Sequence, residues 1–503
     1  MQFELCKQNN TRRTLSTLSF ILCSTAKKCA IFVGFIWYSF RVKLEDTRQE
    51  VFKLRPLFGE LVEQWGKKTL LEYYSQDFPN LQQPTFDVVR SVEIETSKIL
   101  GDTIAKKASE ALSVLKWINT ADHHGLLNHP YFYTAALARS NNLVTKGSGV
   151  TVTLPFGGVS LGNDSFPRGF SFHDAENTEL RIFFKSLEKR RLPVYSLEPM
   201  TKEELLHERD RSRSFQLSAD AHDRLEHVFS NFIEEESVWM QHTYSAQLTA
   251  MNQVLWKTLF NDTRGDFVYL EIDSVVNRLL LEKHLLTETQ VHTLLFKADW
   301  REAFVELFTG VTGSHTESSG THLFWYIDHT QETRRQLFIQ KDSLVTLEKD
   351  VHIPLTPESI ADGLMNRTLM PSTALLLITL QGVEKLASGG GPSQLAYLSA
   401  MMQKWQELLK RFGQESTIPT TSIWCGDNTL FQLIRKDTHE STLATLVDYA
   451  LYENNPIETI DIALSSTSIA ETVDAIAPVL YGIYTKQKVH EKFSYTIPKI
   501  YLS

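Results

Sequence analysis

The hydrophobic period of this chain changes early in the sequence, and this change constrains the fold more than any other feature. Over residues 42–65 and 88–117, apolar side chains recur every three or four positions, which predicts amphipathic helices, the first of them broken at Pro56. From Val150 to Leu154, apolar residues alternate with threonines and lead into glycines, which predicts a strand followed by a turn. This succession of helix, turn and strand is typical of a layered α/β fold.

The second half of the chain continues the pattern. Residues 267–273 and 322–328 each have the composition of a strand that ends in an aspartate, and residues 374–380 are an apolar run that fits a buried strand or a helix. Three glycines at residues 389–391 precede helical spacing over residues 395–412. We therefore expect an α/β protein with a Rossmann-like sheet.

Two regions are expected to be mainly helical. Thr201 and Glu204 form a capping box that starts a helical stretch reaching residue 260, which we interpret as an insertion in the α/β core. Residues 440–484 have the spacing of two helices. These boundaries predict an atypical N-terminal extension (1–41), a first α/β segment (42–200), a helical insertion (201–262), a second α/β segment (263–430) and a helical C-terminal tail (431–503).

Composition and charge exclude some classes of protein. Charged residues make up 22% and hydrophobic residues 42% of the chain, as in ordinary globular proteins, and a formal net charge of -9 argues against binding nucleic acid. Beyond the N-terminal extension the only cysteine is Cys425, which fits a reducing, cytoplasmic location and a buried apolar role. Lys27 and Lys28 interrupt the apolar residues of the extension, so neither half is long enough to span a bilayer, although an N-terminal anchor is not excluded.

The densest group of residues able to carry chemistry is the segment TADHHGLLNHP, which follows the second helical stretch. It contains Asp122, His123, His124 and His129. Histidine exchanges protons near neutral pH and is a common metal ligand, but these spacings match no regular metal motif and leave the metal unknown. We predict that this histidine turn lines a functional pocket, with its imidazoles in acid/base or charge-stabilising roles and Asp122 orienting them. Structural, hydrogen-bonded histidines are the alternative.

The glycine-rich turn is a second candidate for ligand binding. Gly389, Gly390, Gly391 and Ser393 lie where a helix is expected to begin, and backbone amides at such a terminus attract phosphate or carboxylate groups. A nucleotide is therefore a possible cofactor. A tight turn in which Ser393 is the N-cap is the alternative.

A polar loop after the strand at Val150 is the third candidate. Its side chains include Asn163, Ser165 and Arg168. An arginine there can hold a carboxylate or phosphate through two parallel hydrogen bonds. We expect Arg168 to bind an anionic group of the ligand.

Several segments resemble the cysteine-adding enzymes of bacillithiol biosynthesis. They are the run from Leu355-Thr-Pro-Glu through Leu369-Met-Pro to the Gly389-Gly-Gly-Pro-Ser-Gln-Leu-Ala-Tyr-Leu398 turn and helix, the strand end Tyr326-Ile-Asp-His329, and the histidine turn from His124 to Tyr133. Gln394 departs from the acidic residue that the family usually has. The resemblance implies a Rossmann-like core and a ligase or transferase of the cysteine-adding type.

Two classes of function fit these features. The first is a cytoplasmic enzyme that acts on a small anionic metabolite. It would be a ligase or transferase, with a metal-dependent hydrolase as a further alternative. The second is a ligand-binding or scaffolding protein without catalytic activity. Ligands of open α/β sheets gather at the carboxyl ends of the strands, so the enzyme hypothesis requires His124, His129, Arg168 and Gly390 to line one cleft. The oligomeric state is not determined by these patterns.

Overall fold

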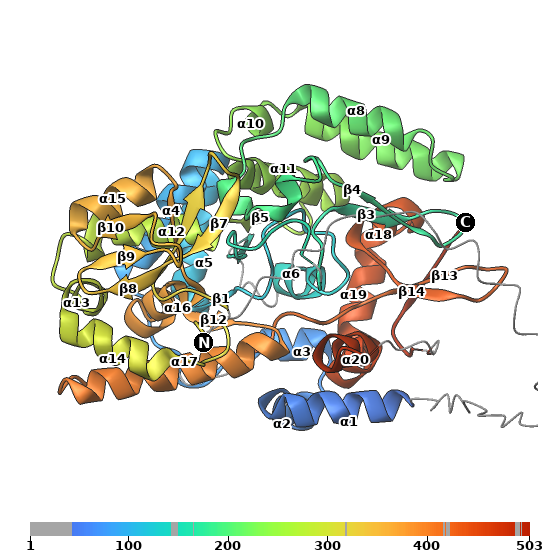
Figure 1. Cartoon of the computed structure of the whole chain (residues 1–503). Helices are drawn as coiled ribbons and strands as arrows, with labels where there is room; N and C mark the ends of the chain where they lie inside the picture. Colours follow the sequence, from blue (N-terminus) through green and yellow to red (C-terminus); the bar gives the residue numbers. More distant parts are fainter. Residues whose placement is uncertain are drawn as a thin grey trace, which may run out of the picture. The chain divides into compact units, whose positions relative to one another are not determined.

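A computed structural model describes residues 43–502, except for residues 142–148, 164, 317–318, 416–417, 419–422, 488–492 and 494 (Figure 1). The predicted N-terminal extension, residues 1–41, therefore lies outside the described residues.

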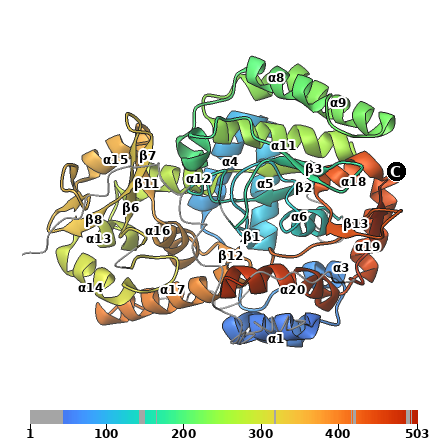
Figure 2. The ribbon, with the colours of Figure 1, turned by 45° about the vertical axis from the view of Figure 1, so that its right-hand side comes forward.

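A four-stranded parallel sheet forms the centre of the fold (Figures 1 and 2). Its strands are β1 (Trp117–Asn119), β2 (Val150–Thr153), β5 (Asp266–Tyr269) and β12 (Ala387–Gly389). They lie side by side in the order β5–β2–β1–β12, so the first strand in sequence has the second on one side and the fourth on the other, as in Rossmann-like sheets. A parallel bridge between Gly390 and Trp424 adds a further extended segment beyond β12. The predicted α/β class is confirmed.

The remaining elements follow in chain order. The N-terminal helices are α1 (Leu44–Leu54), α2 (Pro56–Trp65), α3 (Leu70–Ser75), α4 (Phe86–Leu100), α5 (Asp102–Leu115) and α6 (Tyr133–Ser140). Between β2 and β5 lie β3 (Phe170–His173), β4 (Glu179–Ile182), the short turns η1 (Lys189–Arg191) and η2 (Val194–Ser196), α8 (Lys202–Ser212), α9 (Ala219–Glu234), α10 (Glu236–Trp239) and α11 (Tyr244–Phe260). Between β5 and β12 lie α12 (Ile272–Leu279), the π-helix η3 (Leu280–His284), α13 (Gln290–Phe296), α14 (Ala298–Phe308), β6 (Phe324–Asp328), β7 (Thr333–Gln336), β8 (Phe338–Gln340), β9 (Ser343–Val345), β10 (His352–Pro354), α15 (Pro357–Met365), β11 (Leu369–Pro371), α16 (Thr373–Leu377) and the π-helix η4 (Ile378–Val383). After β12 come α17 (Pro392–Arg411), β13 (Gln432–Ile434), β14 (Ser441–Leu443), α18 (Leu446–Tyr452), α19 (Pro456–Ser466), α20 (Ile469–Thr485) and β15 (Lys499–Tyr501).

Alternate residues of the central strands face two different hydrophobic clusters. Ile118 and Val268 pack into a cluster with side chains of α4, α5 and α12. Trp117 and Phe267, each one residue earlier, pack instead with side chains of α6 and α11. Helices therefore cover both faces of the sheet, as buried parallel strands require. Because α11 belongs to this layer, the last helix of the predicted insertion is part of the core.

Smaller sheets lie outside the parallel one. In the segment between β5 and β12, the strands pair in the orders β11–β6–β7 and β10–β9–β8, and Figure 2 shows them beside the central sheet, next to α13–α16. In the C-terminal part, β13 pairs with β14 in antiparallel and with β15 in parallel orientation. The β3–β4 hairpin contacts α18 of the C-terminal tail. The hairpin also contacts the histidine turn, so it lies between the turn and the tail.

Local sequence signals located several element boundaries correctly. The first helical stretch is broken as expected, because α1 ends at Leu54 and α2 begins at Pro56. Thr201 caps α8 and accepts a hydrogen bond from the backbone N–H of Glu204. The predicted strand at Val150 is β2.

Other local predictions were wrong. The single helix expected over residues 88–117 is two helices, because Gly101 adopts a φ of 84° between α4 and α5. Trp117, expected to be the last residue of that helix, is the first residue of β1. The apolar run 374–380, by contrast, had been left open between a buried strand and a helix, and it is helical, in α16 and η4. The tail has three helices and the strand β14 where two helices were expected, because Thr445 and Ser468 each cap a new helix.

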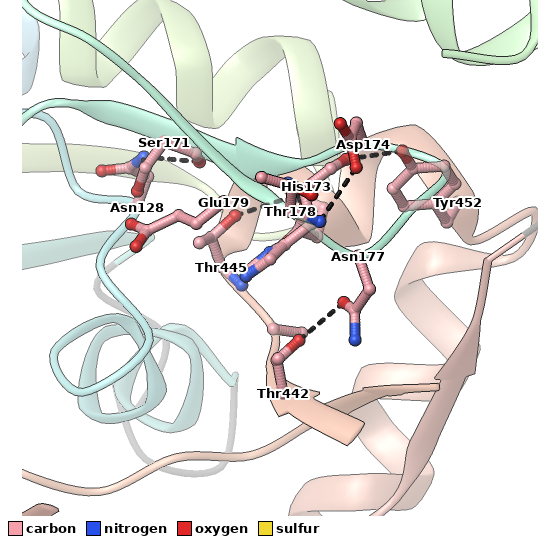
Figure 3. Close-up of polar contacts among 12 residues, drawn as sticks. Asn128, Ser171, His173, Asp174, Asn177, Thr178, Glu179, Thr442, Thr445 and Tyr452 are labelled. Carbon is pink, nitrogen blue, oxygen red and sulfur yellow. Dashed lines mark hydrogen bonds and ion pairs between the residues drawn. The ribbon is translucent and has the colours of Figure 1, made fainter. Parts of the chain in front are cut away.

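Polar contacts hold the histidine turn against the β3–β4 hairpin and the tail (Figure 3). The Asn128 side chain, within the turn, donates to the Ser171 carbonyl at 3.0 Å. His173 Nδ1 lies 2.7 Å from Asp448 Oδ2, and the Tyr452 hydroxyl donates to the His173 carbonyl at 2.7 Å. The first bond joins the turn to the hairpin, and the two bonds of His173 join the hairpin to tail residues 275 and 279 positions away in sequence.

The ion pair of His173 and Asp448 should make stability depend on pH. Burial disfavours the charged imidazole, but the Asp448 carboxylate outweighs it, so the pKa of His173 is raised above 6.5. The contribution to the free energy of unfolding should therefore be fully present below pH 6.5 and decrease as the pH rises through the folded-state pKa. Urea unfolding of the wild type and His173→Gln at several pH values measures it. The difference in free energy of unfolding between the two proteins should shrink as the pH rises. A difference that stays constant or grows would contradict the stabilising ion pair of His173 and Asp448.

Candidate functional site

Ionisable residues gather at the carboxyl ends of the parallel strands. Asp122 and His123 follow β1, Glu271 and Asp273 follow β5, and Asp427 follows the segment that bridges to β12. Parallel strands end at the same edge of a sheet, so residues distant in sequence can meet one ligand there. The candidate site therefore lies at this edge of the sheet.

A cavity of about 220 Å³ lies at this edge and is called the strand-end pocket below. Its polar side chains are those of His123, Asp273, Arg334, Thr373 and Tyr397. Its apolar wall consists of Phe156, Val159, Trp325, Met370, Pro371 and Leu376. The volume lies below the roughly 300–1,000 Å³ of pockets for drug-sized ligands, so the pocket suits a small metabolite.

His123 enters the pocket from the turn after β1. Its backbone N–H donates to Asp122 Oδ1 at 2.7 Å, and its carbonyl accepts from Arg168 Nε at 3.1 Å, which fixes the main chain. The ring atom Nδ1 is buried and has no hydrogen-bond partner among the described residues. Burial, assisted by the Arg168 guanidinium, lowers the pKa of His123 to about 4. The imidazole is thus uncharged at neutral pH and able to accept a proton.

Asp273 enters the pocket from the first turn of α12. Its Oδ2 accepts a hydrogen bond from the backbone N–H of Gly157 at 2.8 Å, whereas Oδ1 is buried without a partner in the described part of the chain. Burial raises the pKa of Asp273 to about 8, and the neighbouring Glu271 carboxylate adds to the shift. This carboxyl group is therefore mainly protonated at neutral pH. The sequence placed Asp273 at the end of a strand, but β5 ends at Tyr269.

Glu271 and Arg367 support this wall of the pocket. Arg367 Nη2 lies 3.1 Å from Glu271 Oε2, and the same guanidinium donates to the Tyr195 carbonyl. A Cβ atom at Gly157 would lie 2.2 Å from Glu271 Oε1, so only glycine fits there. The main chain after β2 can therefore approach the carboxylates closely enough for Gly157 to donate to Asp273.

Asp122 and Arg168 form a buried ion pair inside the histidine turn. Arg168 Nη2 lies 3.0 Å from Asp122 Oδ2, and both side chains are only 1% exposed. The same guanidinium donates to the carbonyls of His123 and Leu126, and the Tyr269 hydroxyl donates to Asp122. Asp122 therefore contacts Arg168 and Tyr269 and not an imidazole. Arg168 Nη1 is buried without a hydrogen-bond partner among the described residues, but Arg168 does not line the strand-end pocket.

His124 and His129 are packed into the protein interior. The His124 ring lies 5.4 Å from the Tyr269 ring, centroid to centroid, and its Nε2 is 3.5 Å from Thr249 Oγ1. The His129 ring packs against that of Tyr131 at 4.7 Å. Burial lowers the pKa of both imidazoles, to about 3 for His124. Their burial fits the alternative of structural histidines, with Nδ1 of His124 left without a hydrogen-bond partner among the described residues.

Asn163 and Ser165 form a local turn away from the strand-end pocket. Asn163 Oδ1 accepts from the backbone N–H groups of Ser165 and Phe166 at 3.1 and 3.0 Å. The Phe166 ring packs on the rings of His123 and His129. This loop therefore covers the histidine turn, and the side chain of Asn163 accepts hydrogen bonds from the loop's own backbone.

The three glycines at the end of β12 and just after it allow close packing of the main chain. A Cβ atom at Gly389 would lie 2.7 Å from Cys425 Sγ, and one at Gly391 would lie 2.2 Å from Asp427 Oδ2. Gly390 donates to the Ile423 carbonyl at 2.9 Å as part of the bridge to the outer segment. The N-cap of α17 is Gly391 and not Ser393, whose Oγ donates to the Tyr484 hydroxyl.

The carboxyl group of Asp427 lies beside this turn, where a phosphate was expected. Burial raises the pKa of Asp427 to about 7, and the Asp122 carboxylate adds to the shift. Its Oδ1 has no partner among the described side chains. A partly ionised carboxyl group disfavours an anion at this position, so the surroundings of the turn do not favour a nucleotide phosphate.

Gly391→Ala should destabilise the protein by about 1–3 kcal/mol, because the new methyl group overlaps the Asp427 carboxyl group and forces one of them to move. Urea unfolding measures the loss. The Asp427→Ala background removes the overlapping atoms, so Gly391→Ala should cost less there. Equal costs in both backgrounds would show that the carboxyl group is not what restricts this position.

The strand-end pocket differs from the cleft expected from the sequence. It contains His123, but His124, His129, Arg168 and Gly390 do not line it. Sequence reasoning missed Asp273 as a site residue, although an aspartate after a buried strand is a usable signal in an α/β fold. Arg334 and Tyr397 reach the pocket from β7 and α17, and nothing near them in sequence signals that placement.

Comparisons with known proteins add no family assignment. No protein-family model matches the chain, and a search of curated proteins found no match. Among the described residues, no group of three or more histidine, cysteine, aspartate or glutamate side chains is arranged to hold a metal ion. None of the described helices combines the length and hydropathy needed to cross a membrane.

Proposed function

We propose that this protein is an enzyme that acts on a small metabolite in the strand-end pocket by acid/base catalysis. The observation that carries the proposal is that His123 and Asp273, from the ends of two different strands, line one cavity, and each has a buried polar atom without a partner among the described residues. Their pKa values, about 4 and about 8, are shifted in opposite directions. Such opposed shifts in one site are the arrangement expected of a base and an acid.

The two groups have complementary roles at neutral pH. The uncharged imidazole of His123 accepts a proton from the attacking group, and the protonated carboxyl of Asp273 donates a proton to the leaving group. One turnover leaves an imidazolium and a carboxylate. Exchange of protons with solvent then restores the starting pair.

Arg334 is the residue that we propose to hold an anionic group of the substrate, in place of Arg168. It lines the pocket from β7, its Nη1 donates to the Gly158 carbonyl at 2.5 Å, and its guanidinium lies 4.3 Å from the centre of the Trp325 ring. A guanidinium has five N–H donors, so one bond to a carbonyl leaves others for a carboxylate or phosphate.

Within this class, we propose transfer or ligation of the cysteine-adding type as the reaction to test first. The histidine turn and the glycine turn, which carry the resemblance, follow adjacent strands in which Asn119 pairs with Gly389. Both segments therefore lie at the same edge of the sheet as the pocket. The small volume suits a substrate of amino-acid size.

A thermal-shift screen with small carboxylates, phosphate esters and amino acids tests the proposal. A ligand of the pocket should raise the melting temperature of the wild type, and Arg334→Gln should lose this increase. His207→Gln, at a side chain that is 78% exposed, is the control and should keep it. A compound that binds in this way but is not turned over would favour the ligand-binding alternative, and no binding by any anionic compound would contradict the proposal.

The pH dependence of kcat/KM should be bell-shaped once a substrate is known. Activity should rise as His123 loses its proton near pH 4 and fall as Asp273 loses its proton near pH 8. Asp273→Asn removes the group that titrates on the alkaline side, so its residual activity should no longer fall there. Activity of the wild type that increases steadily above pH 8 would contradict the role of Asp273 as the acid.

A further inference from the structure

A second cavity, of about 760 Å³, lies at the other edge of the sheet and is called the helical cavity below. It is lined by the end of α4, the start of α5, and residues of α9, α10 and α11. Lys257, one of its lining residues, lies 3.1 Å from Asp266, the first residue of β5. The helical cavity therefore adjoins the amino end of β5, whereas the strand-end pocket lies at the carboxyl ends, and the two share no lining residue.

One wall of the helical cavity is apolar. It consists of Ile99, Leu100, Ile104, Ala250 and Val254, of which all but Ala250 are only partly buried. Ile99 packs against both the cluster around α4 and α5 and the cluster around α9 and α11. The cavity thus opens where two parts of the core meet, and its volume lies within the roughly 300–1,000 Å³ of small-molecule sites.

The polar side of the helical cavity carries more negative than positive charge. Glu234 and Glu235 are exposed at its rim. Lys257, the one lysine or arginine among its described lining residues, is bound by two carboxylates, Asp262 at 2.7 Å and Asp266 at 3.1 Å. A ligand with an apolar body and a positively charged donor complements both walls, whereas an anion would meet two glutamates and a neutralised lysine.

We propose that the helical cavity binds a small organic cation, an ammonium or guanidinium group attached to an alkyl or aryl body. The apolar body lies against Ile104 and Val254, and the charged head donates to Glu234 and Glu235 at the rim. Asn231 adds an acceptor, because its Nδ2 donates to Thr258 Oγ1 at 2.8 Å and its amide oxygen is a further hydrogen-bond acceptor. Besides Glu234, Glu235 and Lys257, the cavity has one more titratable residue among its described lining residues, His227, which is exposed on α9. This site is separate from the proposed catalytic pocket and does not depend on it.

Calorimetric titration of the full chain with 4-phenylbutylammonium and with 4-phenylbutyrate tests the proposal. The two probes share an apolar body and differ in charge. The cation should bind, and the anion should bind several-fold more weakly, because each exposed ionic contact contributes up to about fivefold. Glu234→Gln/Glu235→Gln should abolish this preference, whereas the control Glu203→Gln, on the exposed face of α8, should keep it.

A variant that fills the helical cavity locates the binding site. Val254→Trp, at a partly buried position on the apolar wall, should weaken binding of the cation at least about tenfold by occupying its place. If this variant does not fold, Thr258→Phe on the same helix serves the same purpose. Absence of binding by the cation, equal binding of both probes, or full binding by the filled variant would each overturn the proposal.

Discussion

His123→Gln is expected to lower kcat by about 100- to 10,000-fold, the range in which a positioned general base contributes to turnover. Glutamine keeps similar size and hydrogen-bonding capacity but cannot accept the proton. KM should change little, because the proposed anion-binding group is Arg334 and not the imidazole. Steady-state kinetics with the substrate found by ligand screening measures both constants.

Two controls separate loss of catalysis from loss of structure. His207→Gln changes an exposed histidine on α8 and should leave kcat unchanged. His124→Gln changes the next residue along the chain, which is buried and outside the strand-end pocket, so it should lower stability more than kcat of the folded fraction. Full activity of His123→Gln would remove the proposed base from the mechanism.

Asp122→Ala is expected to lower the free energy of unfolding by about 3–5 kcal/mol, because it leaves the guanidinium of Arg168 buried without its counter-charge. Both side chains are 1% exposed, so water cannot replace the lost carboxylate without a rearrangement. The Tyr269 hydroxyl and the backbone N–H of His123 also lose their acceptor. Urea unfolding measures the loss.

The double variant Asp122→Ala/Arg168→Met tests the reason for this effect. Removing both charges should recover part of the stability lost in Asp122→Ala, because the unpaired guanidinium is gone. A single-variant loss below about 1 kcal/mol would instead match an exposed ion pair. That result would contradict the burial of this pair and the structural role of Arg168.

The fold class could be predicted because its signals are local. Helical spacing marked α1, α2 and α17, and alternation followed by glycines marked β2. The strand β1 was missed because it has three residues and follows α5 directly, so helical spacing continued into it. The run 374–380 was ambiguous because a buried helix and a buried strand can have the same uniformly apolar composition.

The candidate site could be predicted only in part. The sequence located the histidine turn, which lies at the carboxyl end of β1 and supplies His123. It could not tell His123 from His124, because two adjacent imidazoles differ only in which way the folded chain directs them. Arg168 resembled a ligand clamp because its internal partners, Asp122 and two carbonyls, are brought to it only by folding. Asp273 and Arg334 come from distant segments that meet in the tertiary structure.

The most direct test of the proposed active site is a crystal structure of the protein bound to the metabolite that raises its melting temperature. The account predicts the ligand in the strand-end pocket, with a reacting group within hydrogen-bond distance of His123 and Asp273 and an anionic group at Arg334. A ligand bound elsewhere, with His123 and Asp273 free of contact, would contradict it.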